Sequence, residues 1–221
     1  MSSAPDKRWY DDACGTAHAL ELIGERWALL VMRELMLGPK RFGMLRADLP
    51  GISANVLTQR LEGLEAAGLL VKRQLPAPIS TQVYELTPWG YEAEVFIRSM
   101  GRWAARSPAH DASLPISTTS MMLSLKTNFI ASRAKGVTAD VGLRVGSEVC
   151  RARVRAGAIE VERGDVQEAD VVLTAEAGAL ADAIYGGAPL ARLERQKLLR
   201  VEGDRAVAER FVGLFALPDK A

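Results

Sequence analysis

The chain has 221 residues and a formal net charge of +1, from 28 Lys and Arg against 27 Asp and Glu. That balance excludes a strongly basic protein, so any contact with nucleic acid must come from a local basic patch. Hydrophobic residues make up 48% and charged residues 25%, ordinary values for a globular protein. At about 100–150 residues per domain, the length predicts two domains.

Cysteine usage and hydropathy exclude several further classes of protein. Cys14 and Cys150 are too few for a disulfide framework, and with two histidines they are poor material for a zinc site. The N-terminal stretch lacks the apolar region of a secretory signal. The longest aliphatic run, ALLVM, is far shorter than the ~20 residues of a membrane span. We therefore expect a soluble cytoplasmic protein with no membrane partner, no metal and no cofactor.

Apolar residues in the first part of the chain have helical spacing. One helix is expected before Gly24 and a second between Gly24 and the Gly38-Pro39 pair, which ends it. The stretch 41–49 predicts a short third helix. A Pro50-Gly51 turn follows, and the order helix, tight turn, helix is typical of a helix-turn-helix.

The helix after that turn has two contrasting faces. Ser53 is a good N-cap, because its hydroxyl can accept a bond from a free N–H of the first turn. Leucines at 57, 61 and 64 share one stripe, and Gly68 can close the helix in a left-handed conformation. The opposite face carries Asn55, Gln59 and Glu62, which is either an ordinary solvated face or a surface that reads DNA.

The period changes to that of strands after Gly68. The stretches 69–75 and 81–87 alternate like the strands of a hairpin, with a proline-rich tip at 76–80. A long amphipathic helix is then expected over 88–106. The whole order, four helices, a hairpin and a terminal helix, predicts a mainly α winged helix-turn-helix domain over residues 9–106.

A polar, turn-rich stretch at 107–119 predicts a linker. Residues 120–221 differ from the first half in that they combine strand-like and helical patterns. A helix is expected over 121–136, followed by four alternating strands between 137 and 175. Helices at 178–187 and 189–198, a strand at 199–204 and a helix at 205–217 complete the pattern. We predict an α+β domain.

Several short motifs follow one another along the first half of the chain. They are Cys14, LIGERW at 22–27, MRELMLGPKRF at 32–42, LPGIS at 49–53, LTQRL at 57–61 and YELTPWG at 84–90. In this order, and over about residues 9–106, they resemble the HxlR-type family of bacterial winged helix regulators. The resemblance implies a dimeric, sequence-specific transcription regulator with double-stranded DNA as its partner.

The candidate DNA contacts follow from the helix-turn-helix pattern. Asn and Gln can pair bidentately with adenine, and the N-terminal residues of a recognition helix usually reach the bases. Cations beside the groove neutralise phosphates. The candidates are Ser53, Asn55, Thr58, Gln59 and Arg60 on the helix, and Lys40, Arg41, Lys72 and Arg73 beside it. For the cations, ordinary surface charge is the alternative.

Dimerisation would place two such helices about 34 Å apart on a palindromic operator. The first helix and the terminal helix 88–106 offer apolar surface for it. The candidates are Trp9, Leu20, Tyr91, Phe96 and Trp103, some of which must belong to the domain's own core instead.

The second half is similar to sterol carrier protein type 2-like domains, through LRVGSEVCRARV, VLTAEAGALADAIYGG and LLRVEGDRAVAERFVGLF. The similarity covers about 120–217 and implies an apolar cavity for a hydrophobic small molecule. Candidate lining residues are Phe129, Leu143, Val154, Ile184, Tyr185, Phe211 and Phe215. An ordinary core is the alternative, because a core and a cavity lining look the same in sequence.

Two further features bear on the function: Cys14, and the absence of catalytic motifs. In some relatives an N-terminal cysteine senses oxidants or electrophiles, and His18 one turn on is placed to assist; a small packed side chain is the alternative. No hydrolase, protease or P-loop motif is present, so we expect no enzyme. We predict a DNA-binding regulator that responds to a hydrophobic ligand. The alternatives are a hydrophobic-ligand carrier and a thiol sensor acting through Cys14.

Overall fold

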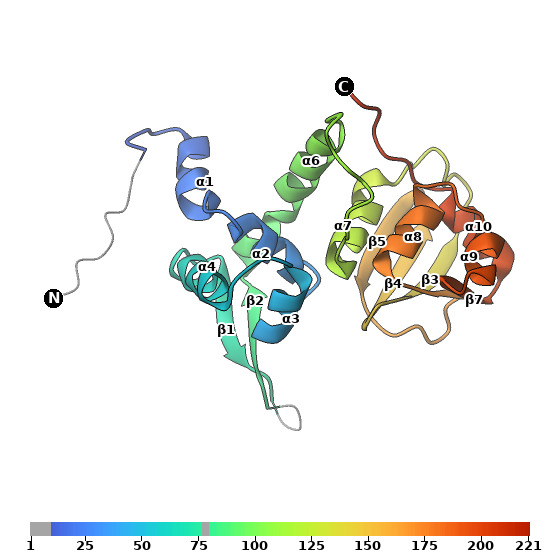
Figure 1. Ribbon diagram of the computed structural model, residues 1–221, viewed down its shortest axis with the longest axis horizontal. Helices are drawn as coiled ribbons and strands as arrows, with labels where there is room; N and C mark the ends of the chain where they lie inside the picture. Colours follow the sequence, from blue (N-terminus) through green and yellow to red (C-terminus); the bar gives the residue numbers. More distant parts are fainter. Residues whose placement is uncertain (1–9, 77–79) are drawn as a thin grey trace. The chain divides into compact units, whose positions relative to one another are not determined.

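The computed structural model describes residues 10–76 and 80–221, in two compact units that meet in sequence at Glu94 and Val95 (Figure 1). The first unit holds four helices, a hairpin and a short fifth helix. Their bounds are α1 (Gly15–Ile23), α2 (Ala28–Leu35), α3 (Phe42–Asp48), α4 (Ala54–Ala66), β1 (Leu70–Gln74), β2 (Gln82–Leu86) and α5 (Pro88–Glu92). This order confirms the predicted winged helix-turn-helix.

Capping residues set the limits of the helices that matter most. The Ser53 hydroxyl accepts a hydrogen bond from the Val56 amide at 3.2 Å, which starts α4 as predicted. Gly68 lies at φ +73°, the left-handed conformation that closes a helix. The buried stripe Leu57, Leu61 and Leu64 fixes the orientation of α4 on the core.

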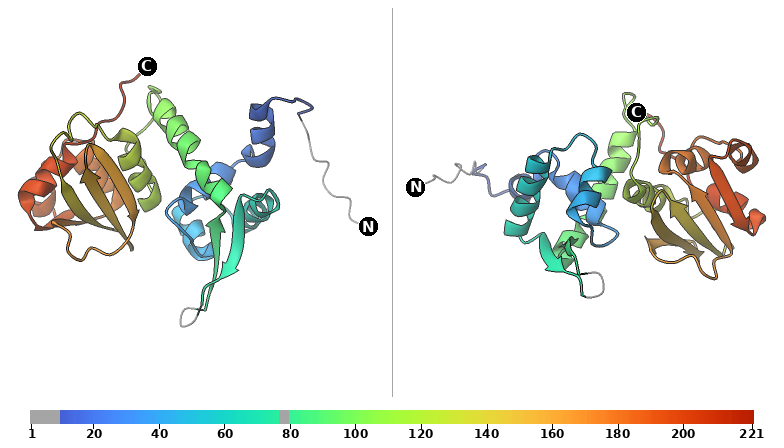
Figure 2. Two further views of the ribbon diagram at one scale, coloured as in Figure 1. Left: turned by 180° about the vertical axis from the view of Figure 1, so that it is seen from behind. Right: turned by 60° about the horizontal axis from the view of Figure 1, so that its bottom comes forward.

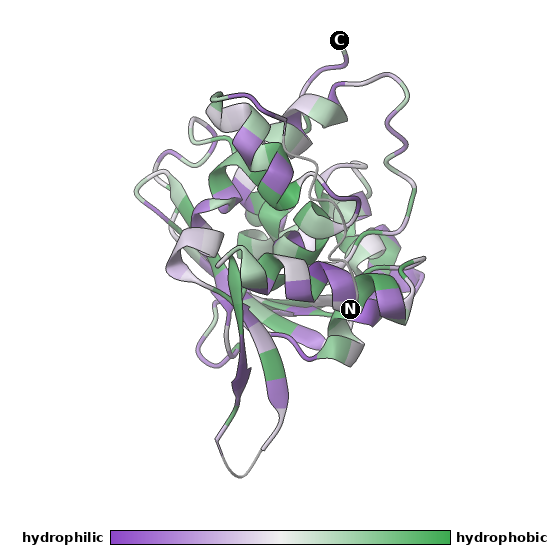
Figure 3. Cartoon of the chain, turned by 90° about the vertical axis from the view of Figure 1, so that its left-hand side faces the viewer, coloured by the Kyte–Doolittle hydropathy of each residue, from purple (hydrophilic) through white to green (hydrophobic). Residues whose placement is uncertain are grey.

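The hairpin extends away from the helices of the first unit (Figures 1 and 2). Strands β1 and β2 pair antiparallel, with Leu70 opposite Leu86 and Gln74 opposite Gln82. Its strands carry strongly hydrophilic stretches toward the tip (Figure 3). The predicted wing tip at 76–80 falls partly on residues 77–79, which lie outside the described part of the chain.

The prediction of one helix over 88–106 was wrong, because two helices occupy it. Helix α5 ends at Glu92, and the Ala93 amide turns back to the Gly90 carbonyl at 3.2 Å. Helix α6 (Glu94–Ala105) then begins, and its contacts group it with the second unit. Gly90 is needed at this corner, since a Cβ there would come within 2.0 Å of the Leu69 carbonyl oxygen.

Replacing Gly90 with Ala should therefore destabilise the first unit by about 2–3 kcal/mol, the upper part of the range for an overpacked core, because the clash is with backbone. Gly101 is the matched control, because it lies inside α6 and a Cβ added there would meet nothing within 4 Å. Gly101→Ala should stabilise by roughly 0.5–1 kcal/mol, since Ala favours a helix. Urea unfolding of both variants measures the difference, and equal midpoints would contradict the close packing at Gly90.

The second unit is an α+β fold around one five-stranded sheet. After α6 its elements are α7 (Thr118–Asn128), β3 (Ala139–Val145), β4 (Glu148–Arg155), β5 (Ala158–Arg163), β6 (Val171–Ala175), α8 (Ala177–Ile184), α9 (Leu190–Arg195), β7 (Leu199–Gly203) and α10 (Arg205–Val212). The strand order is β5-β4-β3-β6-β7, with β3 and β6 parallel and every other pair antiparallel. The predicted α+β class is confirmed.

The sheet of the second unit has a buried face and a polar face. Along β4, buried Cys150, Ala152 and Val154 alternate with more exposed residues, and helices α7, α8 and α10 pack against the buried side. The other side is turned toward the viewer in the left panel of Figure 2. Arginines at 144, 151 and 153 lie on that side.

The helix predicted over 121–136 has different limits. Ser117 caps it by accepting a hydrogen bond from the Ser120 amide, so it starts inside the predicted linker. It ends at Asn128 because Phe129 is extended and forms a β-bridge with Phe215. The helices α8, α9 and α10 are also shorter at their C-terminal ends than their apolar patterns predict.

Candidate nucleic-acid interface

The outward face of α4 is the centre of the candidate interface. Asn55, Thr58 and Gln59 are exposed there, opposite the buried leucines. The preceding turn is closed by a bond from the Ile52 amide to the Leu49 carbonyl at 3.1 Å, with Gly51 at φ +93°. The chain thus enters α4 from a tight turn, and the amide side chains on the first two helical turns of α4 are exposed to solvent.

Two other helix candidates have partners within the unit. The Ser53 hydroxyl is occupied in capping α4, although the residue itself is exposed. Arg60 is partly buried, and its Nη2 lies 3.1 Å from Glu25 Oε2. Arg60 therefore points toward the segment between α1 and α2, and its role as a DNA contact stays a prediction.

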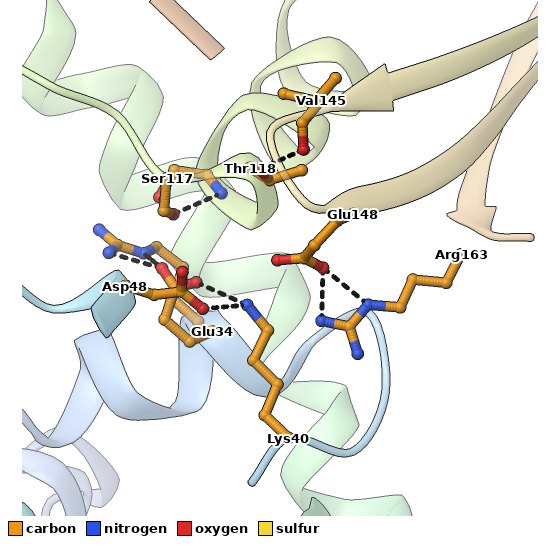
Figure 4. Close-up of polar contacts among 10 residues, drawn as sticks. Glu34, Lys40, Asp48, Ser117, Thr118, Val145, Glu148 and Arg163 are labelled. Carbon is orange, nitrogen blue, oxygen red and sulfur yellow. Dashed lines mark hydrogen bonds and ion pairs between the residues drawn. The ribbon is translucent and has the colours of Figure 1, made fainter. Parts of the chain in front are cut away.

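The assignment of Lys40 as a phosphate contact needs correction. Its side chain is 0% exposed, with Nζ 2.6 Å from Asp48 Oδ2 and 3.2 Å from Glu34 Oε2 (Figure 4). Its backbone pairs with Tyr84 in an isolated β-bridge. Neighbouring Arg41 is exposed at the start of α3. Lys40 is thus a buried internal cation that links α2, α3 and β2, and Arg41 alone of the pair faces solvent.

The wing cations are both exposed, but in different electrostatic settings. Lys72 lies over the Tyr84 ring, with Nζ 5.6 Å from its centroid. Arg73 pairs with Glu85 across the hairpin, so part of its charge is compensated. Arg41 and Lys72 therefore offer more positive charge to a phosphate than Arg73 does.

Cys14 lies at the N-cap position of α1 and is exposed in the single chain, so it does not pack in the core of its own unit. Its pKa is lowered from the ordinary thiol value by hydrogen bonds with the Thr16 amide and side chain and with the Ala17 amide. The His18 ring is paired elsewhere, with Nδ1 3.2 Å from Glu21 Oε2, and it is not among the groups that lower this pKa. Cys150 is fully buried in β4.

The seven residues predicted for an apolar pocket all lie in the second unit. Five are buried in its core, and the rings of Phe129, Phe211 and Phe215 meet edge to face at 5.9 and 5.1 Å. Tyr185 is held by the Ser124 hydroxyl at 2.8 Å, and burial raises the pKa of its phenol. A surface cleft elsewhere in this unit shares none of the seven, so their ligand role remains a prediction.

Sequence reasoning missed how α6 is attached to the second unit. Arg98 donates to the Lys126 carbonyl and to the Thr127 hydroxyl, and Arg102 donates to Asn128 Oδ1 at 3.2 Å. These arginines satisfy acceptors at the C-terminal end of α7, where a cation is favoured. Their spacing of four was visible in the sequence, but the carbonyls they meet were not.

Comparison with known families identifies the family of the helix-turn-helix part of the chain. Residues 22–111 match the model of the HxlR-like helix-turn-helix family, and YodB of Bacillus subtilis, an HTH-type transcriptional regulator, is 35% identical over 86 residues. That match covers 39% of this chain and 77% of YodB. This chain belongs to the HxlR-like helix-turn-helix family. Residues 132–216 match the SCP-2 sterol transfer family, as the similarity of the second half implied.

Other relatives of this HxlR-family chain match a similar share of it. An uncharacterised HTH-type transcriptional regulator of Synechocystis is 36% identical over 87 residues, covering 39% of this chain and 64% of the relative. The solved reduced form of YodB is 31% identical, covers 45% of this chain and 100% of that one, and superposes with a TM-score of 0.40. No described helix is long and apolar enough to cross a membrane.

Proposed function

We propose that this chain is a sequence-specific DNA-binding transcription regulator whose helix α4 enters the major groove. The observation that carries the proposal is the exposed amide and hydroxyl face of Asn55, Thr58 and Gln59 on the first two turns of α4. Amide side chains on a recognition helix can pair bidentately with adenine. Arg41 and Lys72 would contact the flanking phosphates, and the protein would work in the cytoplasm.

A homodimer on a palindromic operator is part of this proposal. Helix α6 is fixed by Arg98 and Arg102 on one side, while Val95 and Trp103 are 73% and 74% exposed. An apolar stripe on a helix pinned from its other side suits burial against a second copy. Tyr10 and Leu20 add further exposed apolar surface in the first unit, whereas Trp9 lies outside the described residues.

The full chain should be titrated against duplexes tiled through the DNA upstream of its own coding sequence. Fluorescence anisotropy at several salt concentrations and a footprint on the tightest duplex give affinity, salt slope and symmetry. We expect one duplex to bind at least about 10³-fold more tightly than a scrambled one. The footprint should show two half-sites one helical turn apart. Equal binding to all duplexes would overturn the proposal.

The second unit would bind a hydrophobic small molecule and bias DNA binding through different affinities for the two states of the dimer. The match to the SCP-2 family supports this role. If the unit instead makes the protein a carrier, ligand binding should raise the melting temperature while no duplex binds specifically.

A thiol sensor is the second candidate function, favoured by exposed Cys14 with its lowered pKa. Because the thiolate is the nucleophile, iodoacetamide should alkylate Cys14 far faster than buried Cys150 in the folded protein. The midpoint of the rate against pH should lie below that of a free cysteine. Oxidant should release wild-type protein from its operator and leave Cys14→Ser bound. An equal response of the two proteins would rule out this mechanism.

A further inference from the structure

A surface cleft of about 500 Å³ lies in the second unit, at the end of the sheet where β3 and β6 finish and β7 begins. That volume is within the range of small-molecule sites. Its lining comes from the ends of β3 and β6, the start of β7, the β3–β4 turn, the start of α8, and the end of α9 with the segment that follows it.

Three polar side chains form a row along one side of this cleft. Arg144 pairs with Thr174 across β3 and β6, and Thr174 pairs with Arg200 across β6 and β7. Cross-strand partners point to the same face of a sheet and lie one strand spacing apart, about 4.8 Å. The sequence shows each residue as a polar position in its strand, but only the register places a hydroxyl between two guanidinium groups.

The central hydroxyl of the row lacks a protein partner. Thr174 Oγ1 is buried and makes no hydrogen bond to any residue in 10–76 or 80–221. Buried polar atoms in folded proteins are nearly always paired. Thr174 belongs to the cleft lining, but its hydroxyl is closed off from solvent, so it would have to turn toward the cleft to donate the missing bond to a ligand oxygen.

The charges around the row of Arg144, Thr174 and Arg200 favour a ligand with a single negative charge. Glu202 is shared by Arg144 at 3.6 Å and Arg200 at 3.0 Å, which leaves one of the two arginine charges uncompensated. Lys197, exposed at φ +59°, adds another cation. Glu194 is neutralised by Arg205 at 2.8 Å. Glu176 is the opposing carboxylate in the lining, so a monoanion is accommodated better than a dianion.

Apolar atoms make up most of the lining surface, but few apolar side chains contribute to it. Leu198 is 49% exposed beside these cations, and Leu199 and Ala175 complete the apolar surface. A single exposed leucine suits one compact apolar group, whereas a long acyl chain would remain largely in water. The aromatic cluster of Phe129, Phe211 and Phe215 takes no part in this site.

We propose that this cleft binds a compact organic monocarboxylate. The carboxylate accepts hydrogen bonds from the Thr174 hydroxyl and from Arg144 or Arg200, and its apolar body lies on Leu198. The site belongs to the second unit alone and does not depend on the DNA contacts of α4. It goes beyond the hydrophobic ligand of the proposed function, because an anionic group, not apolar burial, provides the recognition.

Calorimetric titration of the full chain, without DNA, tests this site with three probes. Benzoate carries the charge and one ring, benzamide has nearly the same shape without the charge, and inorganic phosphate carries charge without an apolar group. We expect benzoate to bind at least about tenfold more tightly than either of the others. Thr174→Val should weaken benzoate about fivefold or more, because the hydroxyl donor is lost.

The double variant Arg144→Gln/Arg200→Gln should weaken benzoate more than tenfold. Arg155→Gln is the matched control, since Arg155 is an exposed arginine on β4 at the opposite end of the sheet. It should bind benzoate like wild type, and thermal melting checks that every variant is folded. Absence of benzoate binding, equal binding of benzamide, tighter binding of phosphate, or wild-type affinity in Thr174→Val would each overturn the proposal. DNA binding by α4 is unaffected by any of these results.

Discussion

Replacing Lys40 with Met should lower the free energy of unfolding by about 3 kcal/mol, at the low end of the cost of breaking a buried ion pair. Glu34 is 0% exposed, and it loses the ammonium 3.2 Å from Oε2. Arg33 still donates to Glu34 Oε1 at 2.8 Å, which keeps the loss from being larger. Asp48, partly exposed, loses its contact at 2.6 Å but can turn to water.

Two further variants separate charge from packing in this cluster. Arg46→Met removes an exposed cation from α3 and should change stability by less than about 0.5 kcal/mol. Lys40→Met/Glu34→Gln removes the Lys40 ammonium together with the Glu34 carboxylate that it would otherwise leave uncompensated. It should recover at least about 1 kcal/mol relative to the single variant, as expected for residues in direct contact. Urea unfolding followed by circular dichroism measures all three, and a Lys40→Met protein as stable as wild type would refute the buried pair.

The Lys40 cluster should also affect DNA binding indirectly. Asp48 ends α3 one residue before the Leu49-Pro50-Gly51 turn, and the Lys40 backbone bonds to Tyr84 on β2 at 3.0 and 2.9 Å. One buried cation thus ties the turn before α4 to the hairpin. Loosening it would let α4 and the wing move independently, at an energetic cost to any contact that needs both.

Local sequence patterns predict most of the first unit because its signals are short in range. The leucine stripe of α4, the Ser53 cap and the left-handed Gly68 are each set by neighbours within one or two helical turns. The wing strands occur where the sequence predicts them, but their burial does not alternate: in β1 only Leu70 is buried, and in β2 Val83, Tyr84 and Leu86 are. These features need no knowledge of distant residues, so one sequence suffices to predict them.

The missed features depend on long-range pairing. Lys40 and Arg41 are adjacent cations in the sequence, and only the β-bridge from Lys40 to Tyr84, 44 positions away, decides that Lys40 points inward. In the same way, strand register brings Arg144, Thr174 and Arg200 into one row. The close packing of Gly90 on the Leu69 carbonyl, near the break at Ala93, likewise joins residues that are far apart in the sequence.

The double variant Asn55→Ala/Gln59→Ala should lose at least about 30-fold in operator affinity. A bidentate contact from an amide side chain to a base is worth about 1–3 kcal/mol of discrimination, and two such contacts roughly add. Both side chains are exposed and neither supports the core, so stability should not fall. Ala is also the better helix former at both positions.

The salt dependence identifies which kind of contact is lost. Since neither amide neutralises a phosphate, the slope of log affinity against log salt should stay as in wild type, and scrambled DNA should bind as before. Lys72→Gln should do the opposite, weakening every duplex similarly and reducing the slope by about one. This contrast distinguishes a base-reading face from a merely polar one.

Glu62→Ala is the matched control on the same helix face. Glu62 is exposed in the third turn of α4, where a carboxylate would repel phosphate if the DNA reached that far. With contact confined to the first two turns, Glu62→Ala should bind the operator as well as wild type or slightly better. If the double variant kept wild-type operator affinity, α4 would not be the reading helix. A loss for Glu62→Ala as large as that of the double variant would mean that the helix lies in the groove differently from what its exposed face implies.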